Sequence, residues 1–540
     1  MTMMSATARG PKPEIEAAVA AARAGAEGPV GRARGVHLAE LVAQIPEARL
    51  AAGPRLAEGG PLLTGVHQDS RRVEAGDLFV ALRGEHADGL GFVPGAVRRG
   101  AVALMVEAGR GVPDTGLPCI EVEHPRAALA RAAAIVYGRP TEALEVVGIT
   151  GTNGKTTTAH LVQHCLDAAG HPCGIVGTLG YRFADLSETA SHTSPEADEL
   201  QRLGASMLAR GASHLVMEVS SIALAAERVA EVRFRLAAFT NLTQDHLDYH
   251  GSMAAYAAAK DRLFFEWQPE VAVVNVDDAH GAGLAERLRA AGRTRVLRTS
   301  SAPDADAELR PAALSLGAHG IRMQLVTAAG RLPLEAPLVG AHNVANLLTT
   351  VGILVGLGVP LEPVLAALRA VPPVPGRLER CDEPGRDDIV AVVDYAHTPD
   401  ALERVLSSVR SLTPPGGHLW CVFGCGGDRD RGKRGPMGEA VARAADRAIL
   451  TNDNPRGEDP AEIAAAVAEG LRRAHGQFEI ELDRGRAIAR AIGQAAAGDV
   501  VLVAGKGHEP YQIVGATVAA FDDRAEVRRA LALRRARGGA

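Results

Sequence analysis

Short aliphatic runs that each end in a polar or glycine-rich loop recur along most of the chain. Between residues 145 and 276 they are EVVGITGT, CGIVGT, HLVMEVSS, LAAFTNL and VAVVNV, and from residue 389 onward they are IVAVVDYAH, HLWCVFG, RAILTNDN and DVVLVAGKG. Such near-continuous apolar runs are typical of parallel strands that are buried on both faces. Helical segments separate the runs, so the pattern predicts an α/β protein with two open, mostly parallel sheets.

The segment ahead of these runs has shorter elements and forms a third unit. Ordered patterning begins at His37, a strand is predicted at Leu78–Leu82, and an Arg-Pro break follows at Pro140. A proline-rich hinge at Pro372–Pro375 separates the two larger units. We therefore predict a small N-terminal α/β domain at 36–142, a central domain at 143–375 and a Rossmann-like C-terminal domain at 376–540.

Composition and charge narrow the class of protein. The chain has 540 residues, of which 47% are apolar and only 3% aromatic, so several aliphatic cores are expected. A total of 58 Lys and Arg against 64 Asp and Glu leaves a net charge of −6. The chain therefore lacks the excess of basic residues that is typical of proteins that bind nucleic acid or an anionic membrane surface, although a local basic pocket is still possible.

Targeting and redox signals are weak. Residues 1–35 are rich in Ala, Gly, Pro and Arg and lack an apolar signal core; we predict a flexible extension in which Ile15–Ala24 could form a helical turn. No run of about 18 apolar residues occurs, so no membrane insertion is expected.

Six scattered cysteines favour buried thiols over a disulfide framework or a zinc site. We expect a cytoplasmic monomer.

The stretch EVVGITGTNGKTTT, which begins at residue 145, carries the strongest chemical signal. A predicted strand, a loop with Gly151 and Gly154, and a predicted helix form the layout in which backbone N–H groups surround phosphate oxygens. Lys155 supplies a charge for the outer phosphates, and the Thr156 hydroxyl suits Mg²⁺. The first glycine is displaced, because Ile149 stands five residues before Gly154. An ordinary strand–turn–helix corner is the alternative, which the lysine and three threonines at the helix start disfavour.

Polar residues at other predicted strand ends are candidate metal ligands. Glu218 follows the apolar run one strand over, and its apolar neighbours Met217 and Val219 favour a metal ligand over a surface carboxylate. The segment DHLDYH at 245–250 is rich in possible ligands. On spacing alone it is a weaker signal, because any one histidine is more often structural.

Two further features allow more than one interpretation. Lys260 lies on a predicted helix of small and apolar residues, which taken alone favours a solvated lysine bonded to a nearby acid. Asp453-Asn-Pro-Arg456 follows a predicted strand, where the arginine could bind a carboxylate through two hydrogen bonds and the aspartate could hold an amine. A helix cap is the alternative, with Asp459-Pro460 opening the next helix, and both interpretations can hold at once.

Taken together in their order, these motifs resemble the Mur ligase family of peptidoglycan synthesis. They are the phosphate loop, MEVSS, TQDHLDYHG, AHNVANLLT, PGRLE, VDYAHTP, GCGGDRDRGKR, DNPR and GKGHE. The resemblance extends from about His37 to the C-terminus. Within the family, the DNPR motif resembles that of the branch that adds meso-diaminopimelate, because lysine-adding relatives lack this arginine.

The resemblance implies a UDP-substrate domain, a central P-loop ATPase and a mobile C-terminal domain that holds the amino acid. It also implies a reaction in which ATP phosphorylates the D-glutamyl γ-carboxylate of UDP-MurNAc-L-Ala-D-Glu. The amine of meso-diaminopimelate then attacks the acyl phosphate, and a tetrahedral intermediate collapses to an amide and phosphate. Elementary chemistry agrees, because an ionised carboxylate repels an amine and phosphorylation creates a good leaving group.

The resemblance further implies roles for individual residues. Those expected to hold ATP are Thr150, Gly151, Thr152, Asn153, Gly154, Lys155, Thr156, Asn343, Asn346, Arg377, Asp394 and His397. Those expected to hold the UDP-substrate are Gln68, Ser70, Glu85, His86, Ala87, His192, Thr193, Ser194, Ser220, Ala226 and Arg228. Those expected to hold diaminopimelate are Arg429, Asp453, Asn454, Pro455, Arg456, Gly505 and Glu509.

The catalytic residues implied are Lys155, Glu218, His246 and Lys260, and Mg²⁺ is expected on Thr156, Glu218, His246 and Lys260. The resemblance reverses the interpretation of Lys260, because reaction with CO₂ converts its cation into an anionic N6-carboxylysine that can position a second Mg²⁺.

Three positions depart from the family: Ile222 replaces a histidine, Ala226 a glutamine and His192 an asparagine. These departures bear on substrate binding, not on the reaction class.

Other functions remain as alternatives. A lysine-adding ligase or a folylpolyglutamate synthase would share the ATP chemistry, but Arg456 and a UDP-type first domain argue against both. A nucleotide-binding protein without ligase activity would not need the full set of Lys155, Glu218, His246 and Lys260.

Overall fold

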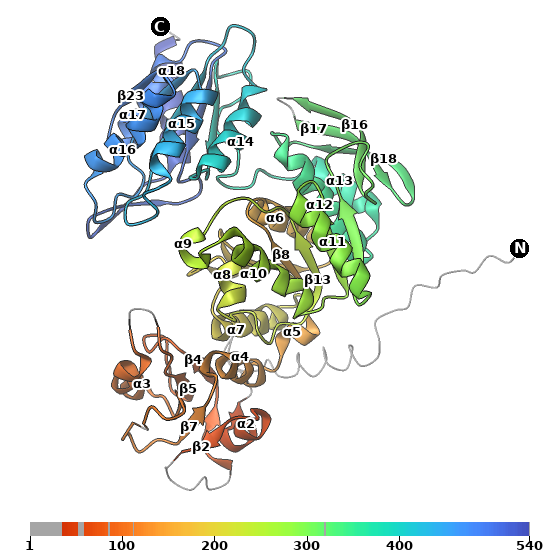
Figure 1. Cartoon of the computed structure of the whole chain (residues 1–540), viewed down its shortest axis with the longest axis vertical. Coiled ribbons are helices and arrows are strands. Elements are labelled where there is room, and N and C mark those ends of the chain that lie inside the picture. Colours follow the sequence, from red (N-terminus) through yellow and green to blue (C-terminus); the bar gives the residue numbers. More distant parts are fainter. Residues whose placement is uncertain (1–34, 52–58, 85–86, 112, 318–319, 539–540) are drawn as a thin grey trace, which may run out of the picture.

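The structure, a computed structural model, describes residues 35–51, 59–84, 87–111, 113–317 and 320–538. Three α/β modules lie in a row along the long axis of the molecule (Figure 1). We call them the N-terminal module (residues 35–136), the central module (140–369) and the C-terminal module (376–538). The expected extension at 1–35 lies outside the described residues, except for Gly35.

The N-terminal module is built on a small sheet with four parallel strands and one antiparallel edge strand. Its strand order is β2 (Arg49–Leu50), β7 (Cys119–Val122), β6 (Ala103–Glu107), β5 (Asp77–Val80) and β4 (Gly65–His67), and β1 (Val36–His37) pairs with β3 (Leu62–Leu63) beside it. The helices are α2 (Leu38–Gln44), η2 (Gly89–Phe92), α3 (Val93–Arg99) and α4 (Pro125–Val136). Two aliphatic clusters fill the space between sheet and helices.

The central module contains a sheet of eight strands, of which six run parallel. The order is β11 (Leu186–Glu188), β10 (Gly180–Phe183), β9 (Cys173–Gly177), β12 (His214–Glu218), β8 (Glu145–Thr150), β13 (Phe234–Phe239), β14 (Val271–Asn275) and β15 (Arg295–Thr299). Strands β10 and β11 are antiparallel additions at one edge. A separate antiparallel sheet, β16 (Arg310–Gly317), β17 (Gly320–Thr327) and β18 (Gly330–Ala336), interrupts the predicted strand–helix alternation.

Helices cover both faces of the central sheet. They are α5 (Pro140–Ala143), α6 (Lys155–Ala168), α7 (Ala197–Ala209), α8 (Ser221–Ala225), α9 (Leu247–His250), α10 (Met253–Phe265), α11 (Ala279–Ala291), α12 (His342–Leu357) and α13 (Leu361–Arg369). One aliphatic cluster joins α6, α12 and α13 to one face, and another joins α7 and α11 to the other. Burial on both faces explains why these strands are apolar at nearly every position.

The C-terminal module repeats the design with five parallel strands and one antiparallel edge strand. The order is β19 (Glu379–Arg380), β20 (Val390–Asp394), β24 (Val500–Ala504), β21 (Leu419–Phe423), β22 (Arg447–Leu450) and β23 (Phe478–Ile480). Its helices are α14 (Pro399–Arg410), α15 (Arg434–Ala444), α16 (Pro460–Arg473), α17 (Arg484–Gln494) and α18 (Asp523–Gly538). An antiparallel hairpin, β25 (Tyr511–Val514) and β26 (Thr517–Ala520), lies outside the sheet.

Several local predictions are confirmed. The Asp459 side chain accepts the Ala461 N–H at the start of α16, and Pro460 is the first residue of that helix. All six cysteines are buried free thiols. The α/β class with mostly parallel sheets also holds, which places the loops after β8, β12, β13, β20, β22 and β24 at carboxyl ends of strands.

Candidate active site

The phosphate loop joins β8 to α6 in a conformation that only glycine permits. Gly151 has φ +139° and Gly154 has φ +88°, and a Cβ at either position would collide with a side chain, that of Thr240 or Asn346. No side chain caps α6, so its first backbone N–H groups face the loop without an internal partner. The loop therefore offers the donors that a phosphate group needs.

Lys155 bonds to its own loop. Its Nζ donates to the carbonyl oxygens of Gly151 and Thr152, each at 2.8 Å. Burial lowers the pKa of this amine, while the negative charges of Glu218 and Asp245 oppose the shift. The side chain is thus held in place by acceptors that a triphosphate oxygen could replace.

Thr156 and Glu218 form a buried oxygen pair at the start of α6. The Thr156 hydroxyl donates to Glu218 Oε2 at 2.9 Å, and the Thr178 N–H donates to Glu218 Oε1 at 2.8 Å. The Glu218 side chain comes from the end of β12, and the residue is only 2% exposed. Two hard oxygen donors side by side match the ligands that Mg²⁺ prefers.

Lys260 reaches the same loop from α10. It is 1% exposed, donates from Nζ to the Gly151 carbonyl oxygen at 3.0 Å, and lies 4.3 Å from the centre of the Tyr256 ring. Burial lowers the pKa of Lys260 well below its ordinary value, and the nearby charge of Lys155 lowers it further. The interpretation of a solvated lysine is therefore excluded.

His246 stands beside this group at the start of α9. Its backbone is left-handed, with φ +52°, its side chain is exposed, and its ring is 6.1 Å from that of Tyr256. Although the ring is partly open to solvent, partial desolvation and the charges of Lys155 and Lys260 lower the pKa of His246, which favours the neutral imidazole. In the part of the chain that the structure describes, no cluster of three or more His, Cys, Asp or Glu side chains is preassembled for a metal.

The other side of the loop is formed by α12. Asn346 Nδ2 donates to Asn343 Oδ1 at 2.8 Å, and Asn343 Nδ2 donates to the Val339 carbonyl oxygen at 2.7 Å. Both asparagines are buried, and Asn346 lies against Gly154. The two expected adenine-side residues thus form one hydrogen-bonded pair next to the phosphate loop.

The C-terminal module contacts this site directly. Arg377 Nη2 donates to the Thr156 hydroxyl at 3.2 Å, and the Arg377 guanidinium lies over the Tyr395 ring, 4.6 Å from its centre. The Thr243 hydroxyl donates to Asp400 Oδ2 at 3.1 Å. Side chains of the last module therefore reach the phosphate loop and the loop that follows β13.

Asp394 and His397 shape the strand end beside Arg377. Asp394 accepts the N–H groups of Leu378 and Ala396, each at 2.8 Å, and burial raises its pKa. His397 bonds through Nδ1 to the Tyr395 carbonyl oxygen at 2.8 Å, and burial lowers the pKa of its imidazole. Both contacts fix the loop after β20.

The residues expected to bind the UDP-substrate are divided between two modules. Gln68, Ser70 and Ala87 lie in the N-terminal module, and the Gln68 N–H donates to Asp198 Oδ2 of α7 at 3.3 Å. Glu85 and His86 lie outside the described residues. These positions are separate in sequence from the other expected contacts, which are in the central module.

The central-module positions for this substrate form a connected group. Ser194 Oγ donates to the Glu218 carbonyl oxygen at 2.9 Å and accepts the Ser220 N–H at 3.0 Å, and Arg228 Nη1 donates to the Ser194 carbonyl oxygen at 3.3 Å. The Thr193 hydroxyl lies 3.1 Å from that of Thr178. His192 lies beside this group, bonded from its N–H to the Tyr181 hydroxyl, while Ala226 ends α8.

The expected diaminopimelate residues converge at the carboxyl ends of β22 and β24. A Cβ at Gly505, where φ is +120°, would lie 2.6 Å from Asp453 Oδ2. Asn454 Nδ2 donates to Glu509 Oε2 at 3.0 Å. Arg456, which follows Pro455, donates from Nη1 to the Gly427 carbonyl oxygen at 2.8 Å. Arg429 is exposed in the loop after β21, and it has no hydrogen bond or ion pair to another described residue.

Three residues of this site were not predicted. Lys506 is 0% exposed and donates to Asn454 Oδ1 at 3.0 Å and Glu509 Oε2 at 3.2 Å. The Tyr395 ring contacts both the Arg377 guanidinium and the His508 ring, and the centres of the two rings are 5.2 Å apart. The position of Lys506 between two glycines at a strand end was a usable signal, whereas the stacking of Tyr395 depends on tertiary contacts.

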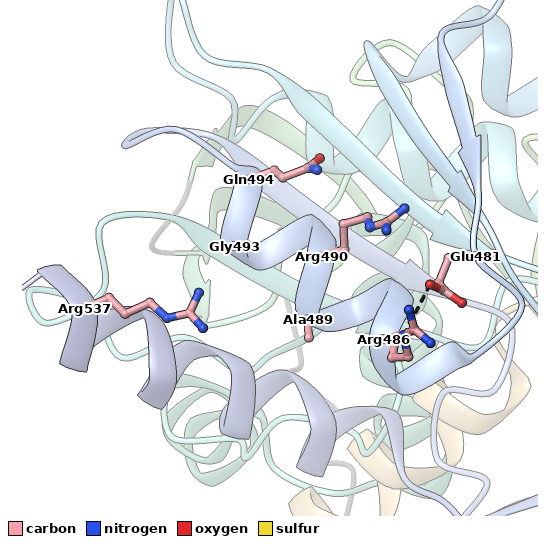
Figure 2. Close-up of a pocket in the computed structure, with 7 residues that line it drawn as sticks. All are labelled: Glu481, Arg486, Ala489, Arg490, Gly493, Gln494 and Arg537. Carbon is pink, nitrogen blue, oxygen red and sulfur yellow. Dashed lines mark ion pairs between the residues drawn. The ribbon is translucent and has the colours of Figure 1, made fainter.

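A surface hollow elsewhere on the C-terminal module is distinct from this site. Figure 2 shows it on α17 and α18, with Arg486 forming an ion pair to Glu481 at 3.4 Å. Its lining residues are Glu481, Arg486, Ala489, Arg490, Gly493, Gln494 and Arg537. None of them belongs to the motifs at the strand ends.

Across the described ranges, no helix is both long enough and apolar enough to cross a bilayer.

Family models match most of the chain. The Mur ligase family, catalytic domain, matches residues 62–145; the Mur ligase middle domain matches 149–354; and the Mur ligase, glutamate ligase domain, matches 376–507. Similar proteins named UDP-N-acetylmuramoyl-L-alanyl-D-glutamate–2,6-diaminopimelate ligase occur in Gloeobacter violaceus and Solibacter usitatus. The first is 46% identical, covering 88% of this chain and 95% of the relative, and the second is 44% identical, covering 92% and 98%.

Solved structures agree with the fold. A structure of UDP-N-acetylmuramoyl-L-alanyl-D-glutamate–2,6-diaminopimelate ligase has a TM-score of 0.62 and 34% identity, covering 88% of this chain and 95% of that one. The MurF ligase from Thermotoga maritima, solved in complex with ADP, has a TM-score of 0.60 at 18% identity, covering 88% and 98%. The fold, the three family models and the close relatives agree. The chain therefore belongs to the Mur ligase family.

Proposed function

We propose that this Mur ligase uses ATP to join meso-diaminopimelate to the D-glutamyl γ-carboxylate of UDP-MurNAc-L-Ala-D-Glu, a step of peptidoglycan precursor synthesis. One observation carries the proposal. The phosphate loop and the 453–456 and 505–509 loops belong to different modules, yet a chain of contacts through Thr156, Arg377, Tyr395 and His508 joins them. The names of the close relatives support the same substrates.

The division of labour follows the modules. We assign the predicted domains 36–142, 143–375 and 376–540 mainly to the UDP-substrate, ATP and the amino acid, respectively. The 192–228 region of the central domain also serves the UDP-substrate, and Arg377, Asp394 and His397 of the last domain also serve ATP. Because ATP is drawn from the cytoplasmic pool, we place the reaction in the cytoplasm. The residues expected at each ligand remain those inferred from the motifs, and the contacts described above are compatible with them.

Acyl activation is the first step. A γ-carboxylate oxygen attacks the γ-phosphorus of ATP, the bond to the β–γ bridging oxygen breaks, and ADP leaves. Lys155 and the free N–H groups at the start of α6 would stabilise the negative charge on the phosphates in this step. Arg377 adds a second cation, and within the described residues its buried Nε has no hydrogen-bond partner.

Amide formation is the second step. The amine nitrogen of diaminopimelate attacks the acyl carbon, and a tetrahedral intermediate forms. The carbon–oxygen bond to phosphate then breaks, and the departing phosphate takes the proton that the nitrogen loses. Asp453, a buried residue whose carboxylate oxygens accept no hydrogen bond from the described residues, would hold an ammonium group of the amino acid. Arg456 uses Nη1 for backbone carbonyls, which leaves Nη2 and Nε for a carboxylate.

Mg²⁺ fits the donor set at the phosphate loop. Thr156 and Glu218 already bring two buried hard oxygens together, so they would hold the ion, with His246 and carboxylated Lys260 at a second position. When bound, Mg²⁺ would neutralise phosphate charge. Carboxylation of Lys260 requires the neutral amine, which its lowered pKa supplies.

The test is phosphate release with ATP, the UDP-dipeptide and a panel of amino acids. We expect release only when meso-diaminopimelate is present, with the tripeptide product found by mass spectrometry. Stimulation by L-lysine instead would identify a lysine-adding ligase. No stimulation by any amino acid would indicate a nucleotide-binding protein and overturn the proposal.

A further inference from the structure

A fully buried ion pair underlies the loops expected to hold the amino acid. Arg484 and Asp523 are both 0% exposed, with Arg484 Nε donating to Asp523 Oδ1 at 2.7 Å and Nη2 donating to Oδ2 at 2.6 Å. Arg484 is the first residue of α17 and Asp523 the first of α18. Neither residue has a role in the proposed reaction.

The remaining donors of Arg484 reach two strand ends. Nη1 donates to the carbonyl oxygen of Asn452 at 3.1 Å, and Nη2 donates to that of Ala504 at 3.0 Å. Each carbonyl belongs to the residue immediately before an expected contact of diaminopimelate, Asp453 or Gly505. One guanidinium therefore fixes where both loops leave the sheet.

Burial alone does not explain this arrangement. A buried ion pair contributes little net stability, because the cost of removing both charges from water offsets their attraction. Two apolar side chains could fill the same space, but they could not bond to two carbonyl oxygens in separate loops. What the pair supplies beyond packing is the relative position of the two loops.

We infer that Arg484, held by Asp523, is a positioning residue that sets the spacing between Asp453 and Gly505 and hence the affinity for the amino acid. This inference rests on the proposed function, since it concerns the diaminopimelate site. The inference also gives α18 a role. Asp523, in the first turn of this helix, would hold Arg484 and so position Asp453, which lies more than 60 residues earlier in the chain.

The chain contains a matched control for this pair. Arg534, on α18, donates from Nε and Nη2 to both oxygens of Asp388 at 2.7 and 2.8 Å, and from Nη1 to the carbonyl oxygens of Ile492 and Ala495. It therefore also bonds to one aspartate and two backbone carbonyls in the same module, although this pair is partly exposed. Asp388 precedes β20, so this pair lies at the amino ends of the strands, away from the site.

The experiment compares Arg484→Lys, Arg534→Lys and wild type by KM for diaminopimelate, KM for ATP, kcat and Tm. We expect Arg484→Lys to raise KM for diaminopimelate about tenfold or more, with KM for ATP within about twofold of wild type. Arg534→Lys should lower Tm and leave both KM values unchanged. A merely structural role for Arg484 would lower Tm without moving KM for diaminopimelate.

A double variant keeps the inference testable if Arg484→Lys does not fold. Arg484→Met with Asp523→Leu replaces both charges by apolar groups, which commonly preserves stability. We expect this variant to fold and to show the same selective rise in KM for diaminopimelate. A KM for diaminopimelate within about twofold of wild type in either folded variant would overturn the inference. A wild-type enzyme whose phosphate release is not stimulated by diaminopimelate would instead refute the proposed function.

Discussion

Two lysine side chains share one carbonyl oxygen at the phosphate loop. Lys155 and Lys260 both donate to the Gly151 oxygen, at 2.8 and 3.0 Å. Burial, reinforced by the charge of Lys155, lowers the pKa of Lys260 well below the lysine norm. A lowered pKa favours the neutral amine, which is the form that the proposed carboxylation by CO₂ requires.

Replacing this lysine tests the modification. We expect Lys260→Ala to lose about 10²-fold or more in kcat, because a fixed anion that orders the phosphate site is gone. Added acetate or propionate should restore part of the activity, measured as phosphate release. Lys155→Ala is the control and should not respond to the acids. A fully active Lys260→Ala enzyme would refute a carboxylate at this position.

Arg456 tests recognition of the amino acid. We expect Arg456→Lys to raise KM for diaminopimelate about tenfold or more while KM for ATP changes little, since a point charge cannot bind a carboxylate through two parallel hydrogen bonds. Arg473→Lys, at an exposed ion pair with Glu439, is the control and should match wild type. Equal weakening of both ligands would contradict the role of Arg456.

At the level of elements, the parallel strands and their carboxyl-end loops could be predicted because each strand is buried on both faces and is therefore apolar throughout. The antiparallel additions could not. Strands β16–β18 alternate apolar and polar residues in a region without motif signals, and β10 and β11 are short. The β25–β26 hairpin matters most, since the Arg456 N–H donates to the Ile513 carbonyl oxygen at 3.1 Å.

The loop after β24 depends on a glycine. We expect Gly505→Ala to raise KM for diaminopimelate about tenfold, because its Cβ would press on Asp453 and left-handed backbone costs about 1 kcal/mol without glycine. Gly416→Ala is the control, since Gly416 also has positive φ, +86°, but nothing within 4 Å of an added Cβ. Steady-state kinetics and Tm separate the two effects. Equal KM values in both variants would show that the loop tolerates the methyl group.

At the scale of the whole molecule, the motifs named residues that the structure gathers at the phosphate loop and the strand ends, but they did not predict how the modules meet. The relative position of two modules depends on a few side-chain contacts, such as Arg377 with Thr156 and Thr243 with Asp400, and no local pattern encodes them. The stacking of Tyr395 escaped prediction for the same reason, whereas Lys506, between two glycines at a strand end, carried a local signal that was not used.

Arg377 provides the test at this scale. We expect Arg377→Ala to lower kcat about 10²-fold, because one cation facing the phosphates is removed and the bond between modules is lost. KM for diaminopimelate should change little. Arg386→Ala, at an exposed ion pair with Glu383, should retain wild-type kinetics. An Arg377→Ala enzyme with normal kcat would show that this contact is dispensable for turnover.

The Thr156 hydroxyl has one further consequence. A single oxygen atom serves Glu218 of the central module as a donor and Arg377 of the last module as an acceptor. One atom therefore joins the two modules, and a ligand that displaced the hydroxyl from either partner would weaken the contact between them. A small inhibitor that bonded to Glu218 and Arg377 together would occupy this junction between the modules without resembling any substrate.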